Sequence, residues 1–143
     1  MFIFILFILF FLFDVGLSEL TFVKNLVILS VLLLNFIVNV KLESTFITIF
    51  VLAGFLFDWY NKNLLGLSSL VLVITLYMYY LLIIRFRGNK LVLYLINYVF
   101  NLILIQCFLG FSLESHFLIQ SSVGALIHTS LSLFWWGKKW SVV

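Results

Sequence analysis

The sequence predicts an all-α integral membrane protein, a single transmembrane domain over residues 1–143 in which six helices form a bundle. Composition is the first reason, because 66% of the 143 residues are hydrophobic and only 9% are charged. A soluble domain of this size needs far more polar groups to cover its surface. Charge placement is the second reason, because three long stretches carry no charged side chain: 64–84, 91–113 and 117–137.

The front half of the chain predicts three shorter helices, over residues 1–13, 26–40 and 45–57, each flanked or interrupted by charged or amide side chains. Such runs span a bilayer when flanking side chains snorkel or the bilayer thins locally. The first run is expected to be a retained helix that reaches toward Leu17. A cleaved signal peptide is not favoured, because the run lacks a positively charged start and residues 14–19 form a poor cleavage site.

The back half predicts three full-length spans over the uncharged stretches. At about 1.5 Å rise per residue, residues 64–84 cover roughly the 30 Å of hydrocarbon in a bilayer. No linker or long loop interrupts this organisation, which favours one membrane domain. Cys107 is the only cysteine and lies inside the fifth predicted helix, so we expect a buried, inert thiol.

The distribution of lysine and arginine predicts that both termini are cytoplasmic. Positive charges concentrate in residues 85–90 and 138–139, which share one side of a six-helix topology, whereas the opposite loops hold two lysines against four acidic residues. Trp135, Trp136 and Trp140 lie beside the terminal lysines, as expected for an aromatic anchor at the cytoplasmic face.

Ionisable residues, which usually mark ion paths or substrate sites within a membrane, are almost absent from the predicted spans. His128 is the sole titratable group well inside one. It lies twelve residues from His116, about 18 Å along one helix, which is too far for the two histidines to share a metal. No hydrolase, zinc-protease or Cys-x-x-Cys motif is present. The sequence therefore predicts no enzyme activity, no cofactor and no metal site, and the net charge of +3 is too small to favour nucleic acid.

The last predicted helix carries a stripe of small and polar residues, which we interpret as a helix-packing face. For His128 this role is favoured over a catalytic or proton-relay role. The members of the stripe share one arc at 100° per residue: Ser121, Ala125, His128 and Ser132.

Two predicted helices carry asparagine pairs at four-residue spacing, Asn35 with Asn39 and Asn97 with Asn101. Each pair lies on one helix face. The pairs either bind each other across the bundle or line a small polar pocket for a ligand, and the first interpretation is favoured. Gln106 lies on nearly the opposite face of the fifth helix.

The hairpin between the third and fourth predicted helices carries the most specific pattern. Gly54 permits a close backbone approach, and Asp58 on the same face can accept hydrogen bonds from free amides at the start of the next helix. Asn61 or Asn63 is the expected N-cap, and Gly66 is expected to leave space for a neighbouring helix. These residues favour a locked hairpin over a binding site.

A basic exit follows the fourth predicted helix, with Arg85, Arg87 and Lys90 within six residues. This patch is expected at the height of the lipid head groups, where anionic lipid is its default partner. Docking of a cytoplasmic protein is the alternative.

The central hairpin carries a pattern of two glycines, one aspartate and a basic exit: Gly54-x-x-x-Asp58, then Leu65-Gly66-Leu67, then Arg85-Phe86-Arg87. This pattern resembles the MreD family of bacterial rod shape-determining membrane proteins. The resemblance implies a non-enzymatic scaffold of five or six helices in the inner membrane, within the complex that elongates the cell wall. It implies an MreC-type protein, an MreB-type filament, and a peptidoglycan glycosyltransferase and transpeptidase as partners. The chain departs from the family in lacking every proline and the usual basic-proline entry before the second helix.

Two other classes remain open at the level of sequence. One is the membrane substrate-binding subunit of an energy-coupling vitamin transporter, a six-helix bundle of similar size to which MreD-like chains are distantly similar. The other is a small respiratory-complex subunit, against which the missing mid-span carboxylate counts.

Overall fold

All regular structure in the described residues is helical, which confirms the all-α prediction. The structure is a computed structural model that describes residues 2–19, 29–38, 44–86, 88–111 and 113–140. The helices are α1 (Phe2–Glu19), α2 (Leu29–Val38), α3 (Ser44–Asn61), α4 (Leu67–Arg85), α5 (Lys90–Phe108) and α6 (Ser115–Trp140).

The turns after α3 and α5 correct two predicted helix boundaries. The fourth helix begins at Leu67 and not at residue 64, because Gly66 has a φ of 98°. The fifth ends at Phe108 and not at residue 113, because Gly110 and Phe111 have φ values of 70° and 58°. A right-handed helix cannot continue through residues in this left-handed conformation.

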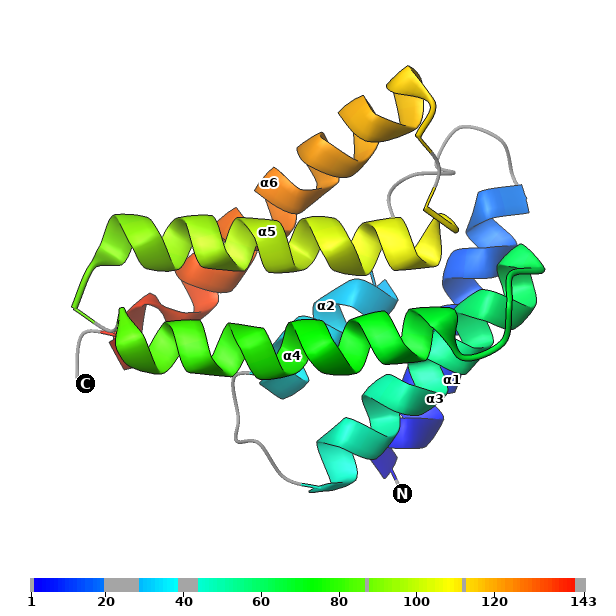
Figure 1. The fold of residues 1–143 in the computed structure, drawn as a ribbon, viewed down its shortest axis with the longest axis horizontal. Coiled ribbons are helices and arrows are strands. Elements are labelled where there is room, and N and C mark those ends of the chain that lie inside the picture. The colour runs from blue at the N-terminus through cyan, green and yellow to red at the C-terminus, as the bar shows by residue number, and fades with distance from the viewer. Residues whose placement is uncertain (1, 20–28, 39–43, 87, 112, 141–143) are drawn as a thin grey trace.

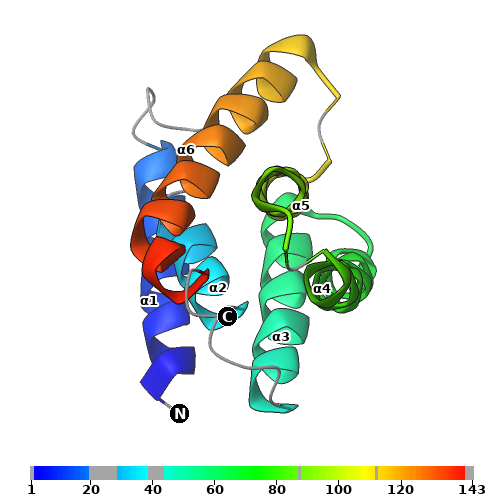
Figure 2. The same cartoon turned by 90° about the vertical axis from the view of Figure 1, so that its left-hand side faces the viewer.

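Consecutive helices from α3 to α6 pack against one another, and α2 contacts α1, α3, α5 and α6. Figure 1 shows α4 and α5 running side by side along the long axis. Figure 2 shows these two helices almost end-on, whereas α1 and α3 run across the view. α1 and α3 therefore cross α4 and α5 at steep angles, and the helices do not all run parallel in one bundle.

Two helices in the described part of the chain, α4 and α5, are long and apolar enough to cross a membrane. Shorter apolar helical stretches cover Phe2–Gly16 and Ile47–Asn61. Only 28% of the apolar window of α4 and 44% of that of α5 is buried, so more than half of each window is at least partly accessible from outside. A core helix of a soluble protein instead buries its apolar side chains. Outward-facing apolar helices favour a membrane location.

Aromatic side chains join α1, α3 and α5 at one end of the fold. Phe57 packs edge-on against Phe108 with ring centroids 5.3 Å apart, and Phe11 packs against Phe108 at 6.0 Å. Phe7 and Tyr60 complete the cluster. Such aromatic pairs contribute about 0.5–1.5 kcal/mol each beyond the area that they bury. This cluster anchors the end of α3 that carries Asp58.

Candidate functional site

Asp58 caps the start of α4 from the last turn of α3. Its side chain is fully buried, with 0% exposed. Its Oδ2 atom accepts a hydrogen bond from the Gly66 amide at 2.8 Å, and both oxygens lie 3.1 Å from the Ser68 amide. Amides at a helix start have no acceptor within the helix, and a negative charge there is also favoured by the helix dipole. The predicted hydrogen bonds of Asp58 are thus present, and they join α3 to α4.

The predicted role of Asn61 or Asn63 as N-cap is wrong. The N-cap of α4 is Gly66, which has no side chain and so makes no side-chain capping hydrogen bond. Asn61 instead donates from Nδ2 to the Phe57 carbonyl at 3.0 Å and to the Phe108 carbonyl at 2.7 Å. Because carbonyls at a helix end lack partners within the helix, Asn61 satisfies one at the end of α5 and ties that end to α3.

The two glycines of the hairpin serve different purposes. A Cβ atom at Gly54 would lie 2.3 Å from the Cα atom of Ser69, so α3 and α4 cross too closely for any side chain there. The Ser69 hydroxyl also donates to the Val51 carbonyl at 2.7 Å across this crossing. At Gly66 a Cβ atom would meet only Phe55, at an ordinary 3.7 Å. Gly66 is therefore needed for its positive φ and not, as predicted, for space.

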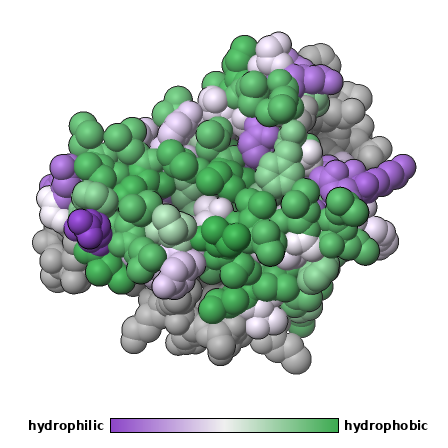
Figure 3. Space-filling view, viewed as in Figure 1, coloured by the Kyte–Doolittle hydropathy of each residue, from purple (hydrophilic) through white to green (hydrophobic). Residues whose placement is uncertain are grey.

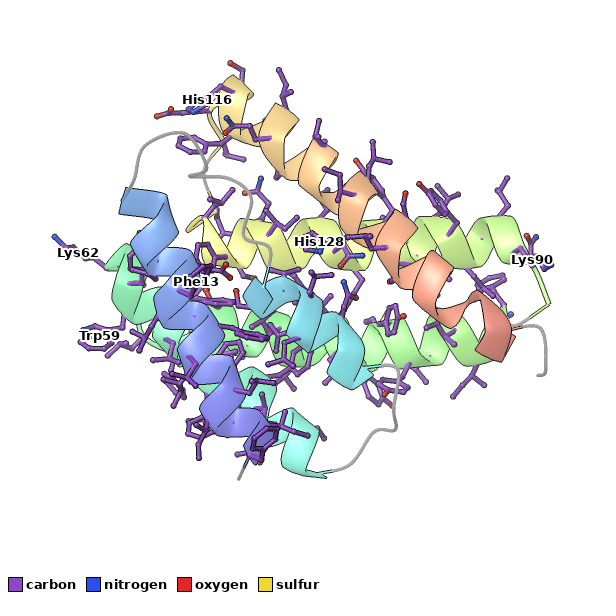
Figure 4. All side chains as sticks on the ribbon, turned by 180° about the vertical axis from the view of Figure 1, so that it is seen from behind. Phe13, Trp59, Lys62, Lys90, His116 and His128 are labelled. Carbon is purple, nitrogen blue, oxygen red and sulfur yellow. The ribbon has the colours of Figure 1, made fainter. Side chains whose placement is uncertain are left out.

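The remaining apolar residues of the hairpin pattern face outward. Leu65 is 71% exposed and Leu67 is 44% exposed. Trp59 and Leu64, at 74% and 82%, extend the same surface, which we call the apolar tip. Figure 4 shows Trp59 projecting from the fold near Lys62, at the end where α3 turns into α4. The apolar tip is thus available to lipid or to a partner.

The structure places Arg85 far from Asp58. Arg85 is exposed at the last residue of α4, and Lys90 is exposed at the first residue of α5. Figure 4 shows Lys62 and Lys90 at opposite ends of the fold. The separation is about the length of α4, roughly 28 Å at 1.5 Å per residue. The third basic candidate, Arg87, lies outside the described residues, as do Asn39 and the side chains of the three C-terminal tryptophans.

Asparagines of α2 and α5 bind each other and α6, as the favoured interpretation predicted. Asn35 donates from Nδ2 to Oδ1 of Asn101. Asn101 in turn donates to the Thr129 hydroxyl at 3.1 Å, and Asn97 donates to the Ser132 hydroxyl at 2.8 Å. We call these five residues the polar ladder. Hydrogen bonds between helices in lipid contribute about 0.6–2 kcal/mol each, so the ladder helps to hold three helices together.

The predicted packing stripe of α6 is buried. His128 is 3% exposed and lies in the interior in Figure 4, and Ser121 and Ala125 are 0% exposed. Ser121 also accepts a hydrogen bond from Gln106 of α5 at 2.9 Å. The stripe is thus buried in the fold, as a helix-packing face requires.

A second buried carboxylate, Asp14, was missed as a site by sequence reasoning. Asp14 is 4% exposed, and its Oδ2 atom accepts from the amide of Ser30 at 2.8 Å and from its hydroxyl at 2.5 Å. It therefore joins α1 to α2 as Asp58 joins α3 to α4. The shared signal is an aspartate late in one apolar helix with a serine early in the next.

The chemistry of these sites is structural in character. No group of three or more His, Cys, Asp or Glu side chains that could hold a metal ion occurs in the residues that the structure describes. Both oxygens of Asp58 already accept amide hydrogens, which positions helices and not a reactant. Comparisons of the chain with protein-family models, curated proteins and solved structures found no match.

Proposed function

We propose that this protein is a non-enzymatic scaffold subunit of the bacterial rod-shape complex, which elongates the cell wall. In this proposal the chain is a multi-pass protein of the inner membrane with six spans and both termini in the cytoplasm. One observation carries the proposal. Gly54, Asp58 and Gly66, which form the MreD-like pattern, meet in one place and lock α3 to α4.

A scaffold must hold its partner-binding surface in a constant orientation. The Asp58 cap sets the start of α4, the Gly54 crossing sets its distance from α3, and Asn61 sets the end of α5. The apolar faces that α4 and α5 turn outward are then held rigidly, which suits recognition of other membrane helices by close packing. Exposed apolar patches of this kind commonly mark interaction sites.

The proposed partners are divided between the membrane-embedded surface and the cytoplasmic side of the protein. An MreC-type protein, with the peptidoglycan glycosyltransferase and transpeptidase, is assigned to the membrane-embedded faces and the apolar tip. An MreB-type filament and anionic membrane lipid are assigned to the cytoplasmic side, where Arg85 and Lys90 are exposed.

Co-purification tests this proposal. A tagged full-length chain, extracted in mild detergent from its own cells, is expected to bring down an MreC-type protein. The paired substitution of Leu65 and Leu67 by serine should reduce this recovery at unchanged protein level, because both side chains are exposed and support no part of the core. Absence of any MreC-type protein, even after cross-linking at native expression level, would refute the scaffold assignment.

The polar ladder supports a second candidate, the substrate-binding subunit of a vitamin transporter. Asn97 is 3% exposed, and its Oδ1 atom has no hydrogen-bond partner within the described part of the chain. A buried acceptor of this kind suits a small polar ligand. Recovery of transporter ATPases in place of an MreC-type protein, or genes for such ATPases beside this one, would favour this candidate.

A further inference from the structure

A groove of about 350 Å³ lies between α4 and α5. This volume is within the lower range of ligand-binding pockets. The groove is open to the surroundings, because Ile74 is 55% exposed and Leu95 is 51% exposed. Its walls are mostly apolar, and the aliphatic side chains among them include Ile74 and Leu82 from α4 with Leu95, Val99 and Ile103 from α5.

The same face of the molecule is hydrophobic over both helices. Figure 3 shows a largely apolar surface across α4 and α5, with hydrophilic side chains at its left-hand end, where Figure 1 places the α4–α5 turn, and again at its right-hand end. Both helices have the length and composition of membrane spans. The natural occupant of an open apolar groove at this position is an acyl chain.

Basic side chains stand at one end of the groove. Arg85 lies one helical turn beyond Leu82, on the face of α4 that lines the groove. Lys90 lies at the same end, five residues or about 7 Å along α5 before Leu95, but on a different face of α5 from the lining side chains. Both are exposed. No acidic residue occurs in the sequence between Asp58 and Glu114, so no neighbouring carboxylate in α4 or α5 neutralises them. The end of the groove therefore favours an anionic head group over a zwitterionic one.

Tyr79 supplies a polar group at an intermediate depth. It lines the groove and is 3% exposed, and its hydroxyl has no hydrogen-bond partner among the residues that the structure describes. Its ring is held against Phe100 at a centroid distance of 4.4 Å. Six residues, or about 9 Å, separate it from Arg85 along α4. A lipid whose phosphate lies beside Arg85 places its glycerol esters below the phosphate, toward this hydroxyl.

We propose that the α4–α5 groove binds an anionic phospholipid, with an acyl chain against the apolar walls, the phosphate beside Arg85 with Lys90 at the same height, and an ester carbonyl accepting from the Tyr79 hydroxyl. This proposal rests on the membrane location within the proposed function. It assigns the groove to lipid and leaves the rest of the exposed apolar surface to the protein partners named there. The lipid acts as a specific ligand of one groove and is distinct from the bulk lipid around the protein.

Native mass spectrometry of the purified full-length chain tests the head-group preference. The protein in mild detergent is offered equimolar phosphatidylglycerol and phosphatidylethanolamine with identical acyl chains. We expect preferential retention of phosphatidylglycerol. Arg85→Gln and Lys90→Gln should each lower the ratio of bound phosphatidylglycerol to phosphatidylethanolamine about fivefold, the usual effect of one basic residue at a membrane surface. Lys62→Gln, which removes an exposed cation from the opposite end, is the matched control and should leave the ratio unchanged.

A second pair of variants tests the groove itself. Val99→Trp fills the groove and should reduce retention of both lipids, whereas Leu70→Trp adds the same ring to an exposed position of α4 outside it. Circular dichroism and gel filtration verify that each variant is folded. Equal retention of the two lipids by the unaltered chain, or equal effects of test and control variants, would overturn the proposal. The assay contains no partner protein, so failure to recover an MreC-type protein does not change its outcome.

Discussion

The substitution Asp58→Ala is the most direct test of the locked hairpin. It leaves the amides of Ser68 and Gly66 without their carboxylate acceptor. Ser68 is fully buried, so leaving its amide without an acceptor lowers the free energy of unfolding by about 1–3 kcal/mol, the usual cost of an unsatisfied buried donor. Gly66 is only partly buried and water can reach its amide. Loss of its hydrogen bond therefore costs about as much stability as loss of an ordinary helix cap, about 1 kcal/mol. The sum is about 3 kcal/mol, or roughly a hundredfold in the ratio of folded to unfolded protein.

The assay is equilibrium unfolding of the purified chain in detergent micelles, followed by circular dichroism, together with the amount of protein in membranes. Asp58→Asn keeps one oxygen acceptor and should lose about half as much stability as Asp58→Ala. Glu114→Ala is the control, because this carboxylate is 73% exposed and its ion pair with His116 at 3.7 Å is worth little. An Asp58→Ala protein within about 0.5 kcal/mol of the unaltered chain, or a larger loss for Asp58→Asn than for Asp58→Ala, would refute the reasoning.

Four further substitutions test other parts of the fold. Gly54→Ala should destabilise by about 1–3 kcal/mol, since its Cβ atom meets the backbone of α4, whereas Gly16→Ala, with nothing within 4 Å, should be neutral or slightly stabilising in the same unfolding assay. Asn101→Leu removes two hydrogen bonds of the polar ladder and should lower the unfolding free energy by about 1–2 kcal/mol; an unchanged midpoint would contradict the role given to the ladder. His128→Leu should leave recovery of an MreC-type protein largely intact, and a complete loss at normal protein level would favour a proton relay instead.

Local patterns in the sequence were sufficient to predict where the helices lie and which faces pack, but not where several of the helices begin and end. The apolar runs around Leu72 and Leu104 predict helices because each residue there is apolar or tolerates burial, and periodicity alone places Asn97 and Asn101 on one face. The Asp58 cap was also predictable, because its acceptors and the free amides lie only eight to ten residues apart in the chain.

Contacts between distant segments could not be predicted in this way. Asn61 looked like an N-cap because asparagine favours that position, yet it binds the carbonyl of Phe108, which lies 47 residues away. The pairing of Asp14 with Ser30 spans 16 residues, through a stretch that the sequence pattern left without a defined turn. In both cases the side chain had several acceptable partners. The packing of α1 against α2 and of α3 against α5 decided which partners lie within reach.

By itself the sequence determined the apolar character of this protein, its helices and the locked α3–α4 hairpin, because these depend on composition and on residues close in the chain. Only the tertiary structure decided three other features. These are the steep crossing of α1 and α3 over α4 and α5, the link from Asn61 to α5, and the groove with Arg85 at its end. The physical reason is that an apolar helix surface offers many nearly equivalent packing angles. A few close contacts, such as Gly54 against Ser69, select among them.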